Sequence, residues 1–189
     1  MSEYSKEFVD KERFQKALQS SIDYQKRHNI IREDYKQLLE ITEGFRNNEK
    51  MFNSTYRAAL KGFLSLIESD IYGLNQLDPY KGYNDRHSFE DKFKKTFKKF
   101  FIEAGKEDNL KEFLDSKYED LKRIKLKRDK LIHPKSVEDI VVASTDEFFI
   151  LKNAFNDYTD FLHFLMTDFF ITIKLNNSND IGNLFKNPD

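Results

Sequence analysis

Residues 56–75, YRAALKGFLSLIESDIYGLN, decide the fold because their apolar side chains recur at steps of three and four residues. This period matches the turn of an α-helix and leaves one face of the helix apolar. The residues on that face are Tyr56, Leu60, Phe63, Leu64, Ile67, Ile71 and Leu74. We therefore predict an amphipathic helix over residues 50–75 that packs on a hydrophobic core.

The segments on both sides of this helix show the same period. Upstream, residues 6–47 predict two charged helices with a break at His28 and Asn29. Their apolar positions are Phe8, Phe14, Leu18, Ile22, Ile30, Ile31, Tyr35, Leu38, Leu39 and Ile41. Downstream, residues 77–85 form a loop, and Ser88 predicts a helix N-cap. The stripe that follows belongs to the core and consists of Phe89, Phe93, Phe97, Phe100 and Phe101.

Two more helices complete the prediction. The first is a single helix from Glu107 to His133, which ends there because Pro134 disfavours helical geometry in the residue before it. The second opens at a capping signal at Ser144 and carries Leu151, Phe155, Tyr158, Leu162, Leu165, Phe169 and Ile173 on its apolar face. The pattern predicts an all-α antiparallel helical bundle in one domain, residues 1–175, with N-terminal helices in 1–48, a core in 50–174 and a polar tail in 176–189.

Composition narrows the classes of function. The chain has 189 residues, 39% of them hydrophobic, and no Cys, so we expect a globular protein without disulfides, a Cys-based zinc site or a thiol nucleophile. The net charge of −1 argues against binding of polyanions by bulk charge. Residues 1–7 lack an apolar signal core and the run 161–173 is too short to span a bilayer, which predicts a cytoplasmic protein with no membrane contact. We expect no metal site and no cofactor.

The stretch 128-RDKLIH-133 has the strongest functional pattern. On a helical wheel Leu114, Leu121 and Arg128 fall close to one line, flanked by Leu131 and Ile132. Arg128 therefore lies in the apolar stripe. A guanidinium in that position needs a carboxylate, a phosphate or a subunit boundary as its partner.

Three further residues complete this candidate site. Asp129 and His133 are four apart, so we expect them to meet on the adjoining face, where the Asp can fix the tautomer of the imidazole. Glu68, which flanks the apolar face of the helix over 50–75, is a candidate partner for Arg128.

The surroundings of this stretch are basic. The cationic residues are Lys122, Arg123, Lys125, Lys127, Arg128, Lys130 and Lys135. We expect them to be opposed locally only by Asp129, which would make a phosphate-attracting surface suited to RNA. The alternative for these residues is an ordinary solvated helix face.

The motif and its context resemble the HEPN superfamily. The signature of that superfamily is an Arg, usually followed by Asn, Asp or His, with a His four to six residues after the Arg; here Arg128, Asp129 and His133 match it, and Pro134 follows. The motif closes a long helix and precedes one last long helix, as in that superfamily. Residues 63–68 also resemble the segment that carries an acidic position in many of its members, here Glu68. The resemblance covers residues 50–174.

This resemblance implies an all-helical, homodimeric and metal-independent endoribonuclease that leaves a 2′,3′-cyclic phosphate. It also implies that His133 acts as the acid or base, that Arg128 neutralises charge in the transition state, and that Asp129 orients one of them. Such a protein would act as a toxin or phage-defence effector, with an antitoxin or a nucleotidyltransferase as its partner.

Two other classes of function stay open. One is a non-catalytic HEPN-like module that binds RNA, a nucleotide or a protein. The other is a structural adaptor that presents the charged N-terminal helices to a partner. At the level of single residues, the alternatives are a structural ion pair with Glu68 for Arg128 and a helix C-cap for His133.

Overall fold

Helices make up most of the described chain in the computed structural model, which gives the backbone of residues 11–176 and the side chains of residue 16 and residues 19–166. In chain order the elements are α1 (Lys11–Gly44), α2 (Glu49–Leu77), α3 (Phe89–Glu103), α4 (Glu107–Ser116), α5 (Tyr118–Ile132), η2 (Val137–Asp139) and α6 (Thr145–Asn176). No strand occurs within these residues, so the predicted all-α class is confirmed. None of the described helices combines the length and the apolar character needed to cross a membrane. The predictions for residues 1–10, for the tail 177–189 and for the side chains of Phe14, Leu18, Phe169 and Ile173 lie outside the described part.

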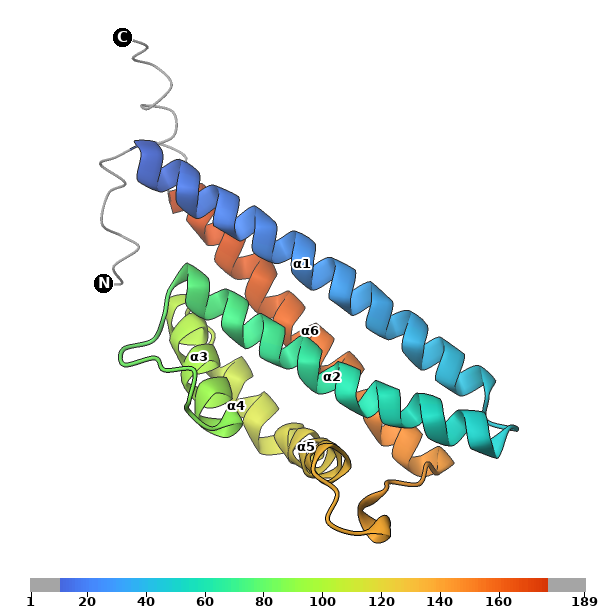
Figure 1. The fold of residues 1–189 in the computed structure, drawn as a ribbon. Coiled ribbons are helices and arrows are strands. Elements are labelled where there is room, and N and C mark those ends of the chain that lie inside the picture. The colour runs from blue at the N-terminus through green and yellow to red at the C-terminus, as the bar shows by residue number, and fades with distance from the viewer. Residues whose placement is uncertain (1–10, 177–189) are drawn as a thin grey trace.

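The helices form a bundle-like arrangement around α2 (Figure 1). α1 runs antiparallel to α2 after a short turn, and α6 lies beside both in the direction of α2 (Figure 1). The shorter helices α3, α4 and α5 pack on the other side of α2 (Figure 1). One hydrophobic core contains buried residues from all six of these helices.

Side-chain caps set the helix starts that the sequence predicts. Asn48 accepts a hydrogen bond from the backbone N–H of Met51 at 3.2 Å, and Ser88 accepts one from Asp91 at 3.1 Å. Ser144 does the same for Glu147 at 3.2 Å at the start of α6. These bonds satisfy N–H groups that have no partner within the first turn of a helix.

The predicted break at His28 and Asn29 is wrong, because α1 is continuous from Lys11 to Gly44. Tyr24, Tyr35 and Leu39, on both sides of the expected break, are all buried. Packing of this one face on the neighbouring helices outweighs the modest helix propensity of His and Asn.

The predicted single helix from Glu107 to His133 is also wrong, because α4 ends at Ser116 and α5 begins at Tyr118. Phe113 and Tyr118 both contact the ring of Phe93, with centroids 6.1 and 5.1 Å away. In an unbroken helix, positions 113 and 118 would point about 140° apart. The Ser116 hydroxyl also bonds to the carbonyl of Glu112 at 2.7 Å, a contact that bends helices. The break at Lys117 lets both rings enter one core.

The phenylalanine stripe of α3 lies in the core, as predicted. Its residues meet the ring of Phe161 from α6, with centroid distances of 5.0 Å from Phe97 and 4.6 Å from Phe101. Phe113 of α4 stacks on the same ring at 4.1 Å. Aromatic pairs of this kind add about 0.5–1.5 kcal/mol each beyond their buried area. Phe161 thus joins the layer of short helices to α6.

Two glycines let α1 approach α2 closely. A Cβ atom at Gly73 would lie 2.3 Å from the ring of Tyr24, which is buried. A Cβ atom at Gly62 would lie 3.1 Å from the ring of Tyr35. The contact is therefore tighter at Gly73, where the Tyr24 ring cannot move aside without losing its buried position.

We expect Gly73→Ala to destabilise the protein, although Ala favours a helix over Gly by about 1 kcal/mol. The forced overlap with Tyr24 should cost about 1–3 kcal/mol more than this gain. Urea unfolding followed by circular dichroism measures the difference. Gly62→Ala is the matched control and should be close to neutral; equal effects of the two substitutions would contradict the close approach at Gly73.

Candidate functional site

The candidate motif lies at the C-terminal end of α5. Leu121, Ile124 and Leu131 are buried against the core and fix the rotation of the helix. α5 ends at Ile132 with His133 as its C-cap, so the predicted end before Pro134 is confirmed. Ile132 was expected to flank the apolar stripe, but 42% of its surface is exposed, and that prediction is wrong.

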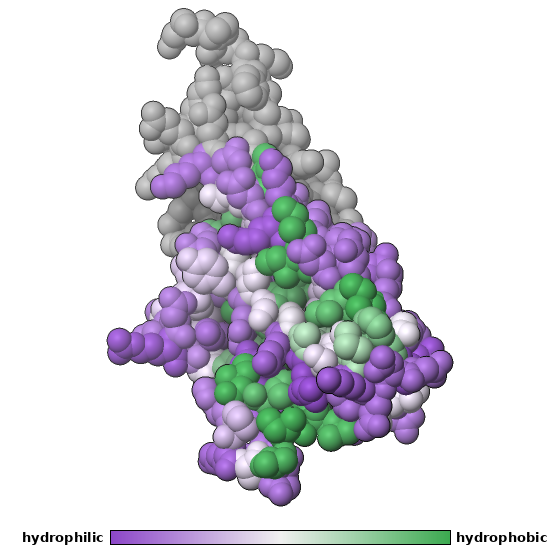
Figure 2. Space-filling model, turned by 45° about the vertical axis from the view of Figure 1, so that its right-hand side comes forward, coloured by the Kyte–Doolittle hydropathy of each residue, from purple (hydrophilic) through white to green (hydrophobic). Residues whose placement is uncertain are grey.

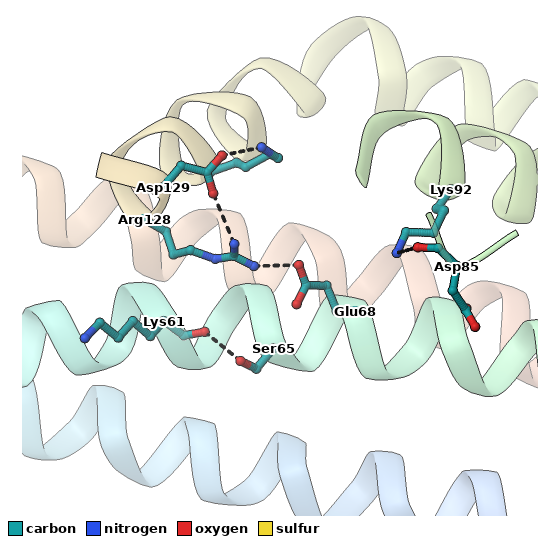
Figure 3. A network of polar contacts seen from close by, with 8 residues as sticks. Lys61, Ser65, Glu68, Asp85, Lys92, Arg128 and Asp129 are labelled. Atoms are coloured by element: carbon teal, nitrogen blue, oxygen red, sulfur yellow. Dashed lines mark hydrogen bonds and ion pairs between the residues drawn. The ribbon is translucent and has the colours of Figure 1, made fainter. Parts of the chain in front are cut away.

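Arg128 reaches from α5 to α2 and lies between two carboxylates (Figure 3). Its Nη2 donates to Glu68 Oε1 at 2.5 Å, and its Nη1 donates to Asp129 Oδ1 at 3.1 Å. Only 17% of the side chain is exposed, as expected for a residue that the helical wheel places in the apolar stripe. The structure therefore contains the ion pair between Arg128 and Glu68. A guanidinium carries five N–H donors, so these two bonds leave three for another acceptor.

His133 does not meet the carboxylate of Asp129, contrary to the prediction. The Asp129 carboxylate pairs instead with Lys125 and Arg128. Helical side chains lean toward the N-terminus, which favours Lys125 as the partner one turn earlier. His133 has left the helix, with φ −124° and ψ 59°, and only its backbone N–H bonds to Asp129, at the carbonyl oxygen, at 3.0 Å. Its ring is exposed and has no hydrogen bond or ion pair to any described residue.

The basic residues are more strongly neutralised than predicted. Glu147 of α6 pairs with both Arg123 and Lys127, and Glu119 pairs with Lys122. The expectation that only Asp129 opposes these cations is therefore wrong. Glu147, which follows Arg123 by 24 residues in the chain, supplies another carboxylate. Burial alone would raise the pKa of Glu147, but the hydrogen bonds from Lys127 and Arg123 outweigh it and lower that pKa.

Two predicted RNA-binding cations keep free ammonium groups. The side chains of Lys130 and Lys135 are exposed, and neither forms an ion pair with a described residue. The backbone N–H of Lys135 donates to Asp139 at 2.8 Å, which orders the connector beside His133. These two lysines and His133 are thus the groups of the motif region most open to a ligand.

The described residues offer no set of metal ligands, since no three His, Asp or Glu side chains converge among them. Comparison with protein-family models, with curated proteins and with solved structures finds no match for this chain. The geometry of the site is therefore the basis for a proposed function.

A buried polar network around Asp70 was missed by the sequence reasoning. Asp70 is fully buried on α2 and accepts hydrogen bonds from Tyr158 of α6 at 2.9 Å and from Tyr24 of α1 at 3.3 Å. The Nδ1 of His28, also on α1, lies 2.8 Å from the same carboxylate. No local pattern links these positions, which are 42 to 88 residues apart. Because Asp70 and both tyrosines are enclosed, we assign the network to the fold and not to catalysis.

We expect Tyr158→Phe to lower stability at neutral pH by about 1.5–3 kcal/mol, because it removes a hydrogen bond to a buried charged group. Burial, and then the charge of Asp70, raise the pKa of Tyr158 well above 10. The folded protein therefore keeps this proton where the unfolded chain releases it, and stability falls as the pH rises above about 10. The variant should show a shallower alkaline loss.

Urea unfolding at pH 7 and at several pH values above 9 measures both effects. Tyr72→Phe is the control, because Tyr72 lies on the surface of α2 and should change neither quantity. An identical pH dependence in Tyr158→Phe and in the wild type would contradict the assigned role of the buried hydroxyl.

Proposed function

We propose that this protein is a metal-independent endoribonuclease of the HEPN type that acts in the cytoplasm as a toxin or phage-defence effector. One observation carries the proposal: the motif from Arg128 to His133 ends a helix with an oriented guanidinium at one side and, at its tip, an exposed imidazole that pairs with no described residue. These are the groups that cleavage of RNA by its own 2′-hydroxyl requires.

The proposed reaction uses His133 for proton transfer. The imidazole removes the proton of a 2′-hydroxyl, the 2′-oxygen attacks the adjacent phosphorus, and the bond from phosphorus to the 5′-oxygen breaks. The leaving oxygen takes a proton from an imidazolium, so the products are a 2′,3′-cyclic phosphate and a 5′-hydroxyl. Arg128 donates its unused N–H groups to the phosphate oxygens as their charge grows, while Glu68 and Asp129 hold the guanidinium in place.

The site needs a second copy of the chain to be complete. Arg128 reaches toward α2, where it pairs with Glu68, whereas the ring of His133 is exposed beyond the last residue of α5. Exposed apolar residues precede and follow His133 in the chain, and we call them the apolar rim: Ile132, Val137, Ile140 and Val142. Apolar residues gather at the lower end of the molecule, at the height where Figure 1 draws the connector between α5 and α6 (Figure 2). An apolar rim next to the motif in the chain supports a homodimer in which Arg128 of one copy faces His133 of the other.

A non-catalytic HEPN-like module is the second candidate. The pairing of Arg128 with two carboxylates and the neutralisation of Arg123 and Lys127 by Glu147 favour it, because both reduce the attraction for phosphate. The apolar rim would then bind a protein such as an antitoxin or a nucleotidyltransferase. Cleavage assays separate the two candidates.

We expect the wild-type protein to cleave RNA in the presence of EDTA and His133→Ala to lose activity by about 10²–10⁴-fold. The products should carry 2′,3′-cyclic phosphate ends, which mass spectrometry identifies. His163→Ala is the matched control, since His163 is an exposed histidine on α6, and it should retain full activity. RNA left intact by the wild type, or cleaved equally by His133→Ala, would remove the proposal.

We further expect Arg128→Ala and His133→Ala to complement each other when the two chains are mixed. The mixed dimer has one site with an intact His133 from one chain and an intact Arg128 from the other. Activity per chain should rise well above that of either variant alone. If each chain holds its own complete site, mixing restores nothing, and the shared arrangement is wrong.

A further inference from the structure

A pocket of about 740 Å³ lies between the chain that leaves α2 and the outer face of α3. Its lining comprises Asp78, Pro79, Tyr80, Lys81, Lys95, Lys98, Lys99, Ile102 and Glu103. None of these residues belongs to the site around Arg128 and His133. The pocket is an open depression, and its volume lies in the range of about 300–1,000 Å³ that small-molecule sites span.

The pocket has an excess of positive charge. Its lining contains four lysines and two carboxylates, which leaves two positive charges. Lys99 is occupied, because it pairs with the carboxylate of Asp78 and donates to the carbonyl oxygens of Asp78 and Pro79 at 3.1 Å. Lys99 therefore neutralises the C-terminal end of α2.

The other lysines are not neutralised in this way. Lys95 lies 3.8 Å from Asp91, a long contact between two exposed side chains. Lys81 and Lys98 are exposed and form no ion pair or hydrogen bond with the part of the chain that the structure describes. A structural role at the end of α2 accounts for Lys99 but not for these three ammonium groups around one depression.

Besides the lysines and the two carboxylates, the lining has an apolar part that is held in place. Ile102 is 47% exposed and belongs to the same lining as the charged residues. Pro79 adds a second apolar surface. The backbone N–H of Tyr80 donates to Asn75 at 3.3 Å, and the Asn75 amide donates to Thr96 of α3 at 2.7 Å. Both walls of the pocket are therefore tied to one buried amide, which preorganises the site.

We propose that this pocket binds a small organic phosphate. The phosphate oxygens bind to Lys81, Lys95 and Lys98, and the apolar part of the ligand packs on Pro79 and Ile102. A ligand with both parts matches the lining better than inorganic phosphate, which leaves Ile102 exposed, or a neutral apolar molecule, which leaves the lysines unpaired.

The test is calorimetric titration of the full chain with phenyl phosphate, phenol and inorganic phosphate at low salt. Phenyl phosphate should bind, with inorganic phosphate weaker and competing, and phenol without measurable affinity. The double substitution Lys81→Gln and Lys98→Gln should weaken phenyl phosphate by about tenfold or more. Lys61→Gln with Lys111→Gln removes the same charge from exposed positions on α2 and α4 and should bind as the wild type does.

Two further measurements make the result decisive. His133→Ala should bind phenyl phosphate as the wild type does, since the pocket shares no residue with the ribonuclease site. The proposal is overturned if phenyl phosphate does not bind, if the Lys81 and Lys98 variant binds it as tightly as the control variant, or if an RNA oligonucleotide is the sole ligand that depends on these lysines.

Discussion

The buried carboxylate of Asp70 is the constraint on which the arrangement of the long helices depends. A carboxylate without partners in a core costs several kcal/mol, so its donors must arrive together with it. Those donors come from α1, through Tyr24 and His28, and from α6, through Tyr158. The carboxylate is satisfied only when both helices lie against the same part of α2. The absence of a side chain at Gly73, one turn away from Asp70, allows the Tyr24 ring to reach that position.

The ion pairs of the candidate site depend on this arrangement of the long helices. Because α2 and α6 are fixed relative to each other, they present Glu68 and Glu147 to the same helix, α5. Arg128 pairs with the first carboxylate, and Arg123 and Lys127 pair with the second. The most basic helix of the chain is thus held by acidic residues from two neighbours, and its uncompensated charge lies toward the end, at Lys130 and beyond.

Local patterns predicted the parts of the fold that local forces determine. The period of apolar residues was sufficient to place α2 and α3. The caps at Ser88 and Ser144 were sufficient to place the starts of α3 and α6. The break at Lys117 could not be predicted in this way, because it depends on Phe113 and Tyr118 meeting one ring of α3. The Asp70 network and the pairing of Glu147 with α5 were missed for the same reason, since their partners are distant in the chain.

A helical wheel predicts side-chain directions in the motif only as far as Ile132, the last residue of α5. The wheel placed Arg128 in the apolar stripe, and its side chain is only 17% exposed, because that residue lies inside the helix. It misplaced His133, which lies one residue beyond the last helical position, where the backbone no longer follows the helical rotation. The ring therefore does not meet the Asp129 carboxylate and is exposed at the end of α5. Among the described residues the imidazole has no partner, and the proposed site shared between two copies would supply one.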